Sequence, residues 1–182
     1  MGRELSGAHR LSTMSFVYLG LGANLGNRLR NLQAGLGALA PGARTLAVSS
    51  LYETEPVGPS GQPPYWNAAA LVETALDPRD LLTLLKRVEW QMGRRLGERW
   101  GPRPLDLDIL LADTVVRSSD LVVPHPRLAE RPFVLVPLAE LAPEVVHPLL
   151  GRTVEELRVQ IGAAGLRRVA GPEWLSACEV RP

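Results

Sequence analysis

Hydrophobic and polar positions follow two different periods along this chain, and their order predicts an α+β fold. Compact apolar runs bounded by turn residues are typical of strands, whereas apolar residues three and four positions apart are typical of helices. These patterns predict strands at 16–21, 43–52, 66–74 and 105–111, and helices at 27–40 and 77–92. The order strand, helix, strand, strand, helix, strand is that of a ferredoxin-like sandwich, an antiparallel sheet with helices on one face.

The chain beyond residue 111 is expected to add elements to this framework. Its pattern predicts a short hairpin at 114–123, a further strand at 133–138 and a last helix at 154–161. We expect one domain at 15–165, preceded by a disordered leader at 1–14 and followed by a tail at 166–182 without a clear period.

Two long connections rich in glycine and proline interrupt the framework. We call them the proline-rich loop, residues 53–65, and the arginine loop, residues 93–104. Loops of this length in a compact domain are usually functional or mobile. Both are therefore expected to lie at a functional site.

Composition narrows the classes of protein to which the chain can belong. Hydrophobic residues make up 46% of 182 residues and the formal net charge is +1, so the chain can form a core and lacks the basic field of a nucleic-acid binder. Cys178 is the only cysteine, which excludes a disulfide framework and a cysteine metal cluster. No apolar run approaches the roughly 20 residues that span a membrane. We expect a cytoplasmic monomer without nucleic-acid or membrane partners.

The last strand of the framework carries two aspartates, Asp106 and Asp108. Residues i and i+2 of a strand point to the same face, so the two carboxylates would project side by side, with Leu105, Leu107 and Ile109 on the other face. Paired carboxylates on a rigid element suit hard divalent cations. Alternating Asp and Leu is equally typical of a charged edge strand.

The arginine loop favours the first of these interpretations. It contains Arg94, Arg95, Arg99 and Arg103 together with Trp100, directly before the aspartates. Guanidinium groups are natural partners of phosphate oxygens because their planar fork matches phosphate geometry. The combination indicates magnesium-nucleotide chemistry, although the chain contains no P-loop sequence.

A glycine run between the first strand and the first helix supports a rival function. Residues 20–26 read G-x-G-x-x-x-G, which is similar to a dinucleotide fingerprint and would suit a nicotinamide-dependent reductase. The second strand ends at Ser49 and Ser50 rather than at an acidic residue, which weakens this alternative. A non-catalytic ferredoxin-like ligand sensor is the other alternative, and it would not need the aspartate pair.

Three further side chains are candidates for a pocket that takes a flat heterocycle. The rings of Tyr65 and Phe133 could stack on such a ligand and the amide of Asn67 could match its edge, although spacing alone favours core packing. His125 lies between Pro124 and Pro126, whose rings hold the turn rigid and either aim the imidazole or fix it in a packed position.

Taken together, these residues closely resemble the 6-hydroxymethyl-7,8-dihydropterin pyrophosphokinase family of the folate pathway. The matching segments are 19–26, 49–58, 62–69, 89–108 and 123–127, in family order between about residues 16 and 151. The stretch ERWGPRPLDLDIL at 98–110 is highly specific. The resemblance implies a ferredoxin-like fold and transfer of pyrophosphate from ATP to the pterin hydroxymethyl group, with release of AMP.

The resemblance also implies roles for individual residues. Asp106 and Asp108 would hold two Mg²⁺ ions and, with Arg94 and Arg103, form the catalytic set. ATP-side contacts are implied for Lys86, Glu89, Arg99, Trp100, Ile109, His125 and Arg131. Pterin contacts are implied for Thr54, Glu55, Pro56, Val57, Tyr65, Asn67 and Phe133. The arginine loop is about one residue shorter than in some members, which leaves the counterpart of Arg95 open.

Overall fold

The computed structural model describes residues 14–56, 58–95 and 101–176, and it confirms the expected order of the framework. Its elements are β1 (Ser15–Ala23), α1 (Arg28–Ala38), β2 (Ala43–Val48), β3 (Leu51–Thr54), β4 (Tyr65–Thr74), α2 (Pro78–Gln91) and β5 (Asp106–Ala112). The sheet has the strand order β10-β3-β4-β1-β5, with β2 also paired to β4. Every pairing in it is antiparallel, as the ferredoxin-like pattern requires.

Both framework helices begin at the capping residues that the sequence contains. The side chain of Asn27 accepts a hydrogen bond from the Arg30 N–H, and Asp77 accepts from the two N–H groups that follow Pro78. Such caps satisfy amide groups that the first helical turn leaves without a partner. They fix where α1 and α2 start, and therefore how each helix lies on the sheet.

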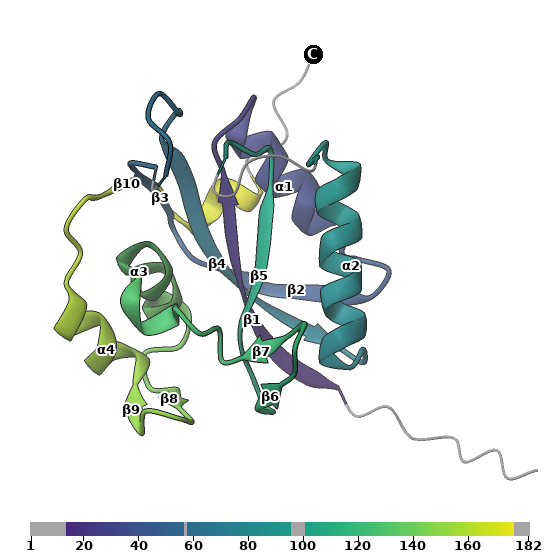
Figure 1. Ribbon diagram of the computed structural model, residues 1–182, viewed down its shortest axis with the longest axis vertical. Coiled ribbons are helices and arrows are strands. Elements are labelled where there is room, and N and C mark those ends of the chain that lie inside the picture. The colour runs from purple at the N-terminus through teal and green to yellow at the C-terminus, as the bar shows by residue number, and fades with distance from the viewer. Residues whose placement is uncertain (1–13, 57, 96–100, 177–182) are drawn as a thin grey trace, which may run out of the picture.

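The core consists of two layers of apolar side chains, one on each face of the sheet. Leu19, Leu32, Leu85 and Leu107 belong to the layer between the sheet and helices α1 and α2. The opposite layer lies under α3 (Pro132–Leu141) and α4 (Val154–Ile161). Figure 1 shows α1 and α2 on one side of the sheet and α3 and α4 at its other side.

The predicted strand at 133–138 is wrong, because this segment lies in α3. An apolar run of this length without a clear period is compatible with a strand or with a buried helix. Pro132 at the first helical position supports helix initiation, and Leu135, Val136 and Leu138 are all buried. The expected arrangement with helices on one face is therefore extended by α3, together with α4, on the other face.

The predicted single strand at 43–52 is divided into β2 and β3 by Ser49 and Ser50. Both serines are buried, and the hydroxyl of Ser49 accepts the Ala69 N–H at 2.8 Å. The Ser50 N–H instead donates to Glu140 of α3 at 2.8 Å. The interruption therefore connects the sheet to α3.

The segment after residue 165, for which no period was evident, contains regular structure. β10 (Leu166–Ala170) pairs with β3, and a 3₁₀ turn η2 (Pro172–Leu175) buries Trp174 against the α1 side. The indole of Trp174 donates to the carbonyl of Ser49 at 2.8 Å. This segment thus packs onto the sheet.

The remaining additions are small. The expected hairpin is present as β6 (Val116–Arg117) and β7 (Val122–Val123), and the last helix has the predicted bounds. A second small pair, β8 (Val146–His147) and β9 (Arg152–Thr153), precedes α4, and a 3₁₀ turn η1 (Leu128–Glu130) precedes α3. Within the described ranges, no helix is long and apolar enough to cross a membrane.

Candidate active site

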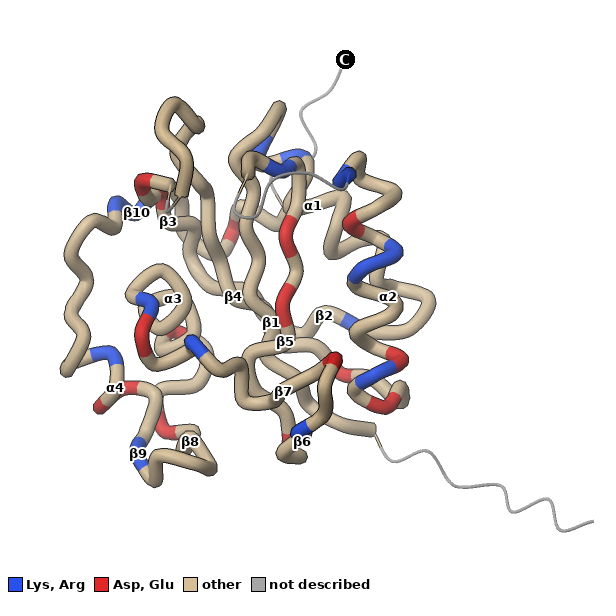
Figure 2. The backbone as a smooth tube through the Cα atoms, viewed as in Figure 1, with Lys and Arg blue, Asp and Glu red and all other residues tan. Residues whose placement is uncertain are grey.

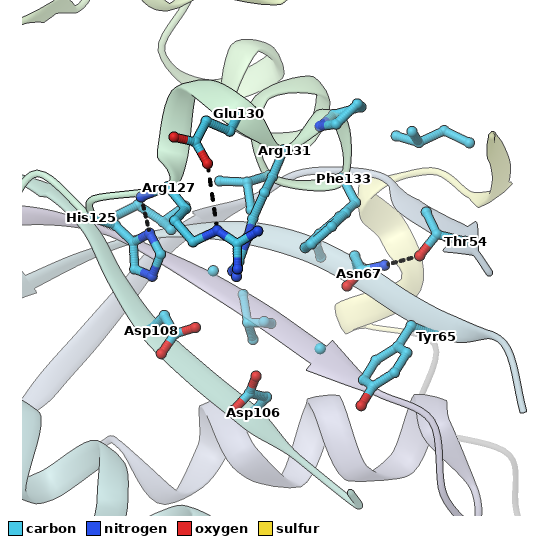
Figure 3. Close-up of a pocket in the computed structure, with 18 of the residues that line it drawn as sticks. Thr54, Tyr65, Asn67, Asp106, Asp108, His125, Arg127, Glu130, Arg131 and Phe133 are labelled. Atoms are coloured by element: carbon cyan, nitrogen blue, oxygen red, sulfur yellow. Dashed lines mark hydrogen bonds and ion pairs between the residues drawn. The ribbon is translucent and has the colours of Figure 1, made fainter. Parts of the chain in front are cut away.

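A cavity of about 550 Å³ opens between the sheet and the start of α3. It is lined by strand ends and by the turns that precede α3, and Figure 3 shows the side chains that face it. Of the residues implied by the resemblance, it brings together Thr54, Glu55, Tyr65, Asn67, Arg94, Arg103, Asp106, Asp108, His125, Arg131 and Phe133. These residues are separated by up to 79 positions in the chain, and the sheet topology places them around one space.

The two aspartates lie on the cavity face of β5, as the alternation predicts. Leu107 between them is fully buried in the α2-side core, whereas Asp106 and Asp108 both line the cavity. Figure 2 shows acidic positions along β5. Across the strand pair, Asp108 is opposite Gly20 and Asp106 is opposite Gly22. The floor beside each carboxylate is therefore backbone.

Two arginines flank the first aspartate. Oδ1 of Asp106 lies 2.5 Å from Nη1 of Arg94 and 3.2 Å from Nη1 of Arg103. Burial raises the pKa of Asp106, but these guanidinium groups and Lys86 outweigh it and hold the pKa below the ordinary value of 3.8. The carboxylate is ionised at neutral pH, which is the form that binds cations.

Glu89 supports this arrangement from beneath the cavity. Its carboxylate is buried and accepts the Leu107 N–H at 2.7 Å, Lys86 Nζ at 2.8 Å and Arg94 Nη1 at 2.5 Å. One side chain of α2 therefore fixes the start of β5 and orients Arg94. This role differs from the nucleotide contact that the resemblance implies for Glu89.

The opposite end of the cavity is bordered by aromatic side chains and carries less charge. Figure 3 shows Phe133 of α3 and Tyr65 of β4 on two sides of the space in which Asn67 lies. The amide nitrogen of Asn67 donates to the Thr54 hydroxyl at 2.8 Å, which leaves its carbonyl oxygen to serve as an acceptor. Burial raises the pKa of Tyr65 above 10.0, so its hydroxyl stays protonated.

His125 lies beyond Asp108 and has a defined tautomer. Its Nδ1 accepts the Arg127 N–H at 3.1 Å, so the proton of the neutral ring resides on Nε2. Burial lowers the pKa of His125 below 6.5, and Arg131 and Arg127 lower it further against the opposing effect of Asp108. The neutral imidazole can thus donate one hydrogen bond into the cavity.

Some residues implied by the resemblance do not line the cavity. Lys86 lies on α2, where its Nζ is 3.7 Å from Asp108 Oδ1. The side chain of Ile109 belongs to the core on the other face of β5, and Pro56 is not among the lining residues. Val57, Arg99 and Trp100 lie outside the described residues.

The glycine run does not form the turn that the reductase alternative needs. β1 continues to Ala23, so Gly20 and Gly22 are strand residues. A Cβ atom at Gly20 would lie 3.1 Å from Leu110, and one at Gly22 would lie 3.4 Å from Asn67 Oδ1. The absence of side chains at Gly20 and Gly22 therefore lets Leu110 and Asn67 pack close to the backbone of β1.

Asn24, which was not among the predicted site residues, connects the proline-rich loop and the arginine loop. Asn24 is buried, and its Oδ1 accepts the Arg103 N–H at 2.7 Å while its own N–H donates to the Arg103 carbonyl at 3.1 Å. Its Nδ2 lies 3.2 Å from both Gln62 Oε1 and the Pro63 carbonyl. The sequence signals for it were its place directly after a strand, in a glycine-rich turn, and its position within the matching segment 19–26.

Comparison with known proteins identifies the family to which this arrangement belongs. Residues 18–143 match the family model described as 7,8-dihydro-6-hydroxymethylpterin-pyrophosphokinase (HPPK). The chain belongs to the HPPK family. The matched region runs from β1 through α3, and so includes both ends of the cavity.

Curated relatives match the chain along most of their length. A 2-amino-4-hydroxy-6-hydroxymethyldihydropteridine pyrophosphokinase of Pseudomonas aeruginosa is 43% identical over 158 residues, covering 85% of this chain and 97% of the relative. One of the same name from Methylorubrum extorquens is 41% identical over 159 residues, covering 86% and 99%.

Solved structures support the ferredoxin-like HPPK fold. The wild-type HPPK-DHPS of Plasmodium falciparum with SDX-DHP superposes with a TM-score of 0.67 at 15% sequence identity. The match covers 86% of this chain and 48% of that one. The chain therefore spans about half the length of that structure.

Proposed function

We propose that this chain transfers the pyrophosphoryl group of ATP to the hydroxymethyl group of 6-hydroxymethyl-7,8-dihydropterin. The hydroxyl oxygen forms a bond to the β-phosphorus, the bond from that phosphorus to the oxygen bridging the α-phosphate breaks, AMP leaves with that oxygen, and the hydroxyl proton passes to water. One observation supports this above others. A single cavity combines an aromatic and amide end with a carboxylate and guanidinium end.

The aromatic end suits the pterin. Tyr65 and Phe133 would stack on its two faces, because aromatic rings favour offset stacking with flat heterocycles. The carbonyl oxygen of Asn67 would accept from the pterin edge, since Thr54 occupies its amide nitrogen. Glu55 and the backbone near Thr54 line the same end of the cavity.

The charged end suits a triphosphate that arrives with magnesium. Within the described residues, no group of three or more acidic, histidine or cysteine side chains is arranged so that it could hold a metal ion. Mg²⁺ commonly uses only one or two carboxylates together with substrate phosphates, so Asp106 and Asp108 fit this requirement. Bound there, two ions would neutralise developing negative charge and orient the phosphates.

Arginines would complete the phosphate site. Arg94 and Arg103 border Asp106, and Arg131 reaches the cavity from the turn before α3. Each charge-assisted contact contributes about 1.5–3 kcal/mol. The proline-rich loop and the arginine loop would close over the substrates and exclude water, which would otherwise hydrolyse ATP.

The decisive experiment measures AMP formation from ATP, Mg²⁺ and the hydroxymethyl pterin. We expect turnover by the unmodified chain, its loss on addition of EDTA, and at least a roughly hundredfold decrease in Asp106→Asn and Asp108→Asn. Asp113→Asn is the matched control, because Asp113 follows β5 and binds the Phe16 N–H outside the cavity. Saturable pterin binding without AMP formation would favour the ligand sensor instead.

A further inference from the structure

The wall of the cavity beside His125 contains an arginine to which neither the sequence pattern nor the family resemblance gives a role. Arg127 lines the cavity together with Arg131 and both aspartates. We propose that Arg127 is an additional contact for the ATP phosphates, and this inference rests on the proposed function. It predicts that Arg127 contributes to ATP binding and not to pterin binding.

Two local contacts hold Arg127 in place, one through its backbone and one through its side chain. Its main-chain N–H donates to His125 Nδ1 at 3.1 Å, which ties its backbone to the phosphate-side histidine. Its Nε lies 3.5 Å from Glu130 Oε2, one turn further along η1. In Figure 3, Arg127 and Arg131 extend from neighbouring positions toward the space that Asp108 also faces.

The charge pattern of this wall favours an anionic ligand. Burial lowers the pKa of Arg131, and Arg127 lowers it further, against the opposing effects of the carboxylates of Asp108, Asp106 and Glu130. Burial also lowers the pKa of His125, and Arg131 and Arg127 add to that effect against Asp108. Cations held near each other in a partly buried space repel, and a polyanion between them relieves that repulsion. The triphosphate is the polyanion of the proposed reaction. The planar fork of an arginine can contact two phosphate oxygens at once, which a lysine cannot.

Arg127 lies away from the end of the cavity that is proposed to bind the pterin. The phosphate-side wall contains His125, Arg127 and Arg131, whereas Asn67 and Thr54 form the opposite end in Figure 3. One structural contact of the Arg127 side chain is its ion pair with Glu130. That pair has side-chain exposures of 46% and 66%, and exposed pairs contribute little to folding stability. Loss of this pair alone should therefore change the free energy of unfolding little.

The test compares Arg127→Gln with Arg30→Gln by calorimetric titration of Mg²⁺-ATP and, separately, of the pterin. Arg30 is an exposed residue of α1 outside the cavity, so its variant changes the net charge equally. We expect Arg127→Gln to weaken ATP binding roughly ten- to a hundredfold relative to Arg30→Gln. Arg127→Lys should be intermediate, and pterin affinity and the denaturation midpoint should not change.

Three results would overturn the assignment. They are an ATP affinity of Arg127→Gln within twofold of that of Arg30→Gln, an equal loss of pterin affinity, and a chain that does not bind ATP at all. AMP formation by the unmodified chain is followed in parallel. Normal turnover combined with an unaffected Arg127→Gln would refute the role of Arg127 while leaving the proposed function standing.

Discussion

The same substitution should affect the stability differently at two glycines of α1. A Cβ atom at Gly35 would lie 2.6 Å from Leu105 Cδ2 and 3.1 Å from Cδ1, whereas one at Gly37 would meet no atom within 4 Å. Leu105 is fully buried, so it cannot turn into solvent. Gly35→Ala therefore overpacks the core at the residue that directly precedes Asp106.

Two contributions determine the expected change in stability of each variant. Alanine is favoured over glycine within a helix by about 1 kcal/mol, and this gain applies to both variants. Overpacking costs about 1–3 kcal/mol and applies only to Gly35→Ala. Gly37→Ala should thus be more stable than the unmodified chain by up to about 1 kcal/mol, and Gly35→Ala less stable than Gly37→Ala by about 1–3 kcal/mol.

Urea denaturation with comparable m-values measures both changes. Gly35→Ala should also lower AMP formation, because a displaced Leu105 shifts the start of β5. Leu105→Val in the Gly35→Ala background should recover part of the stability, since it removes atoms that the new methyl group contacts. Equal stabilisation by the two glycine substitutions would refute the packing argument.

Three other outcomes are expected. Asn24→Ala removes three side-chain hydrogen bonds to the two loops, and should lower the free energy of unfolding by about 2–4 kcal/mol in denaturant titrations. Phe133→Ala should weaken pterin binding roughly ten- to a hundredfold by calorimetry, with a smaller effect on ATP, because it removes one stacking face. Arg167 and Trp66 hold the pKa of Glu53 below 4.5, so this residue stabilises the fold above that pH and the benefit disappears as pH falls below it. In Glu53→Gln, the free energy of unfolding should therefore depend less on pH than in the unmodified chain. Unfolding measured between about pH 3 and 7, the range around the ordinary carboxylate pKa, checks this.

The framework could be predicted from sequence because its signals are local. Caps at Asn27 and Asp77 and the alternation along β5 depend on residues a few positions apart. The aspartate pair was recognisable for the same reason, since strand geometry alone places both carboxylates on one face.

The errors arose where the structure depends on distant contacts. α3 is apolar on all sides because sheet and α4 cover it, so its sequence has no helical period to detect. β10 is recognisable only through its pairing with β3. Asn24 acts across 79 positions to reach Arg103, and no spacing rule predicts such a bond.

The pairing of Gly20 and Gly22 with the two aspartates has a consequence for inhibition. A ligand resting on this part of the floor would contact peptide groups rather than side chains. A single substitution could alter that surface only by adding a side chain, which at Gly20 would crowd Leu110 and at Gly22 would come into contact with Asn67. Variants that escape an inhibitor bound there should therefore arise in the surrounding loops, where side chains can change without disturbing the sheet.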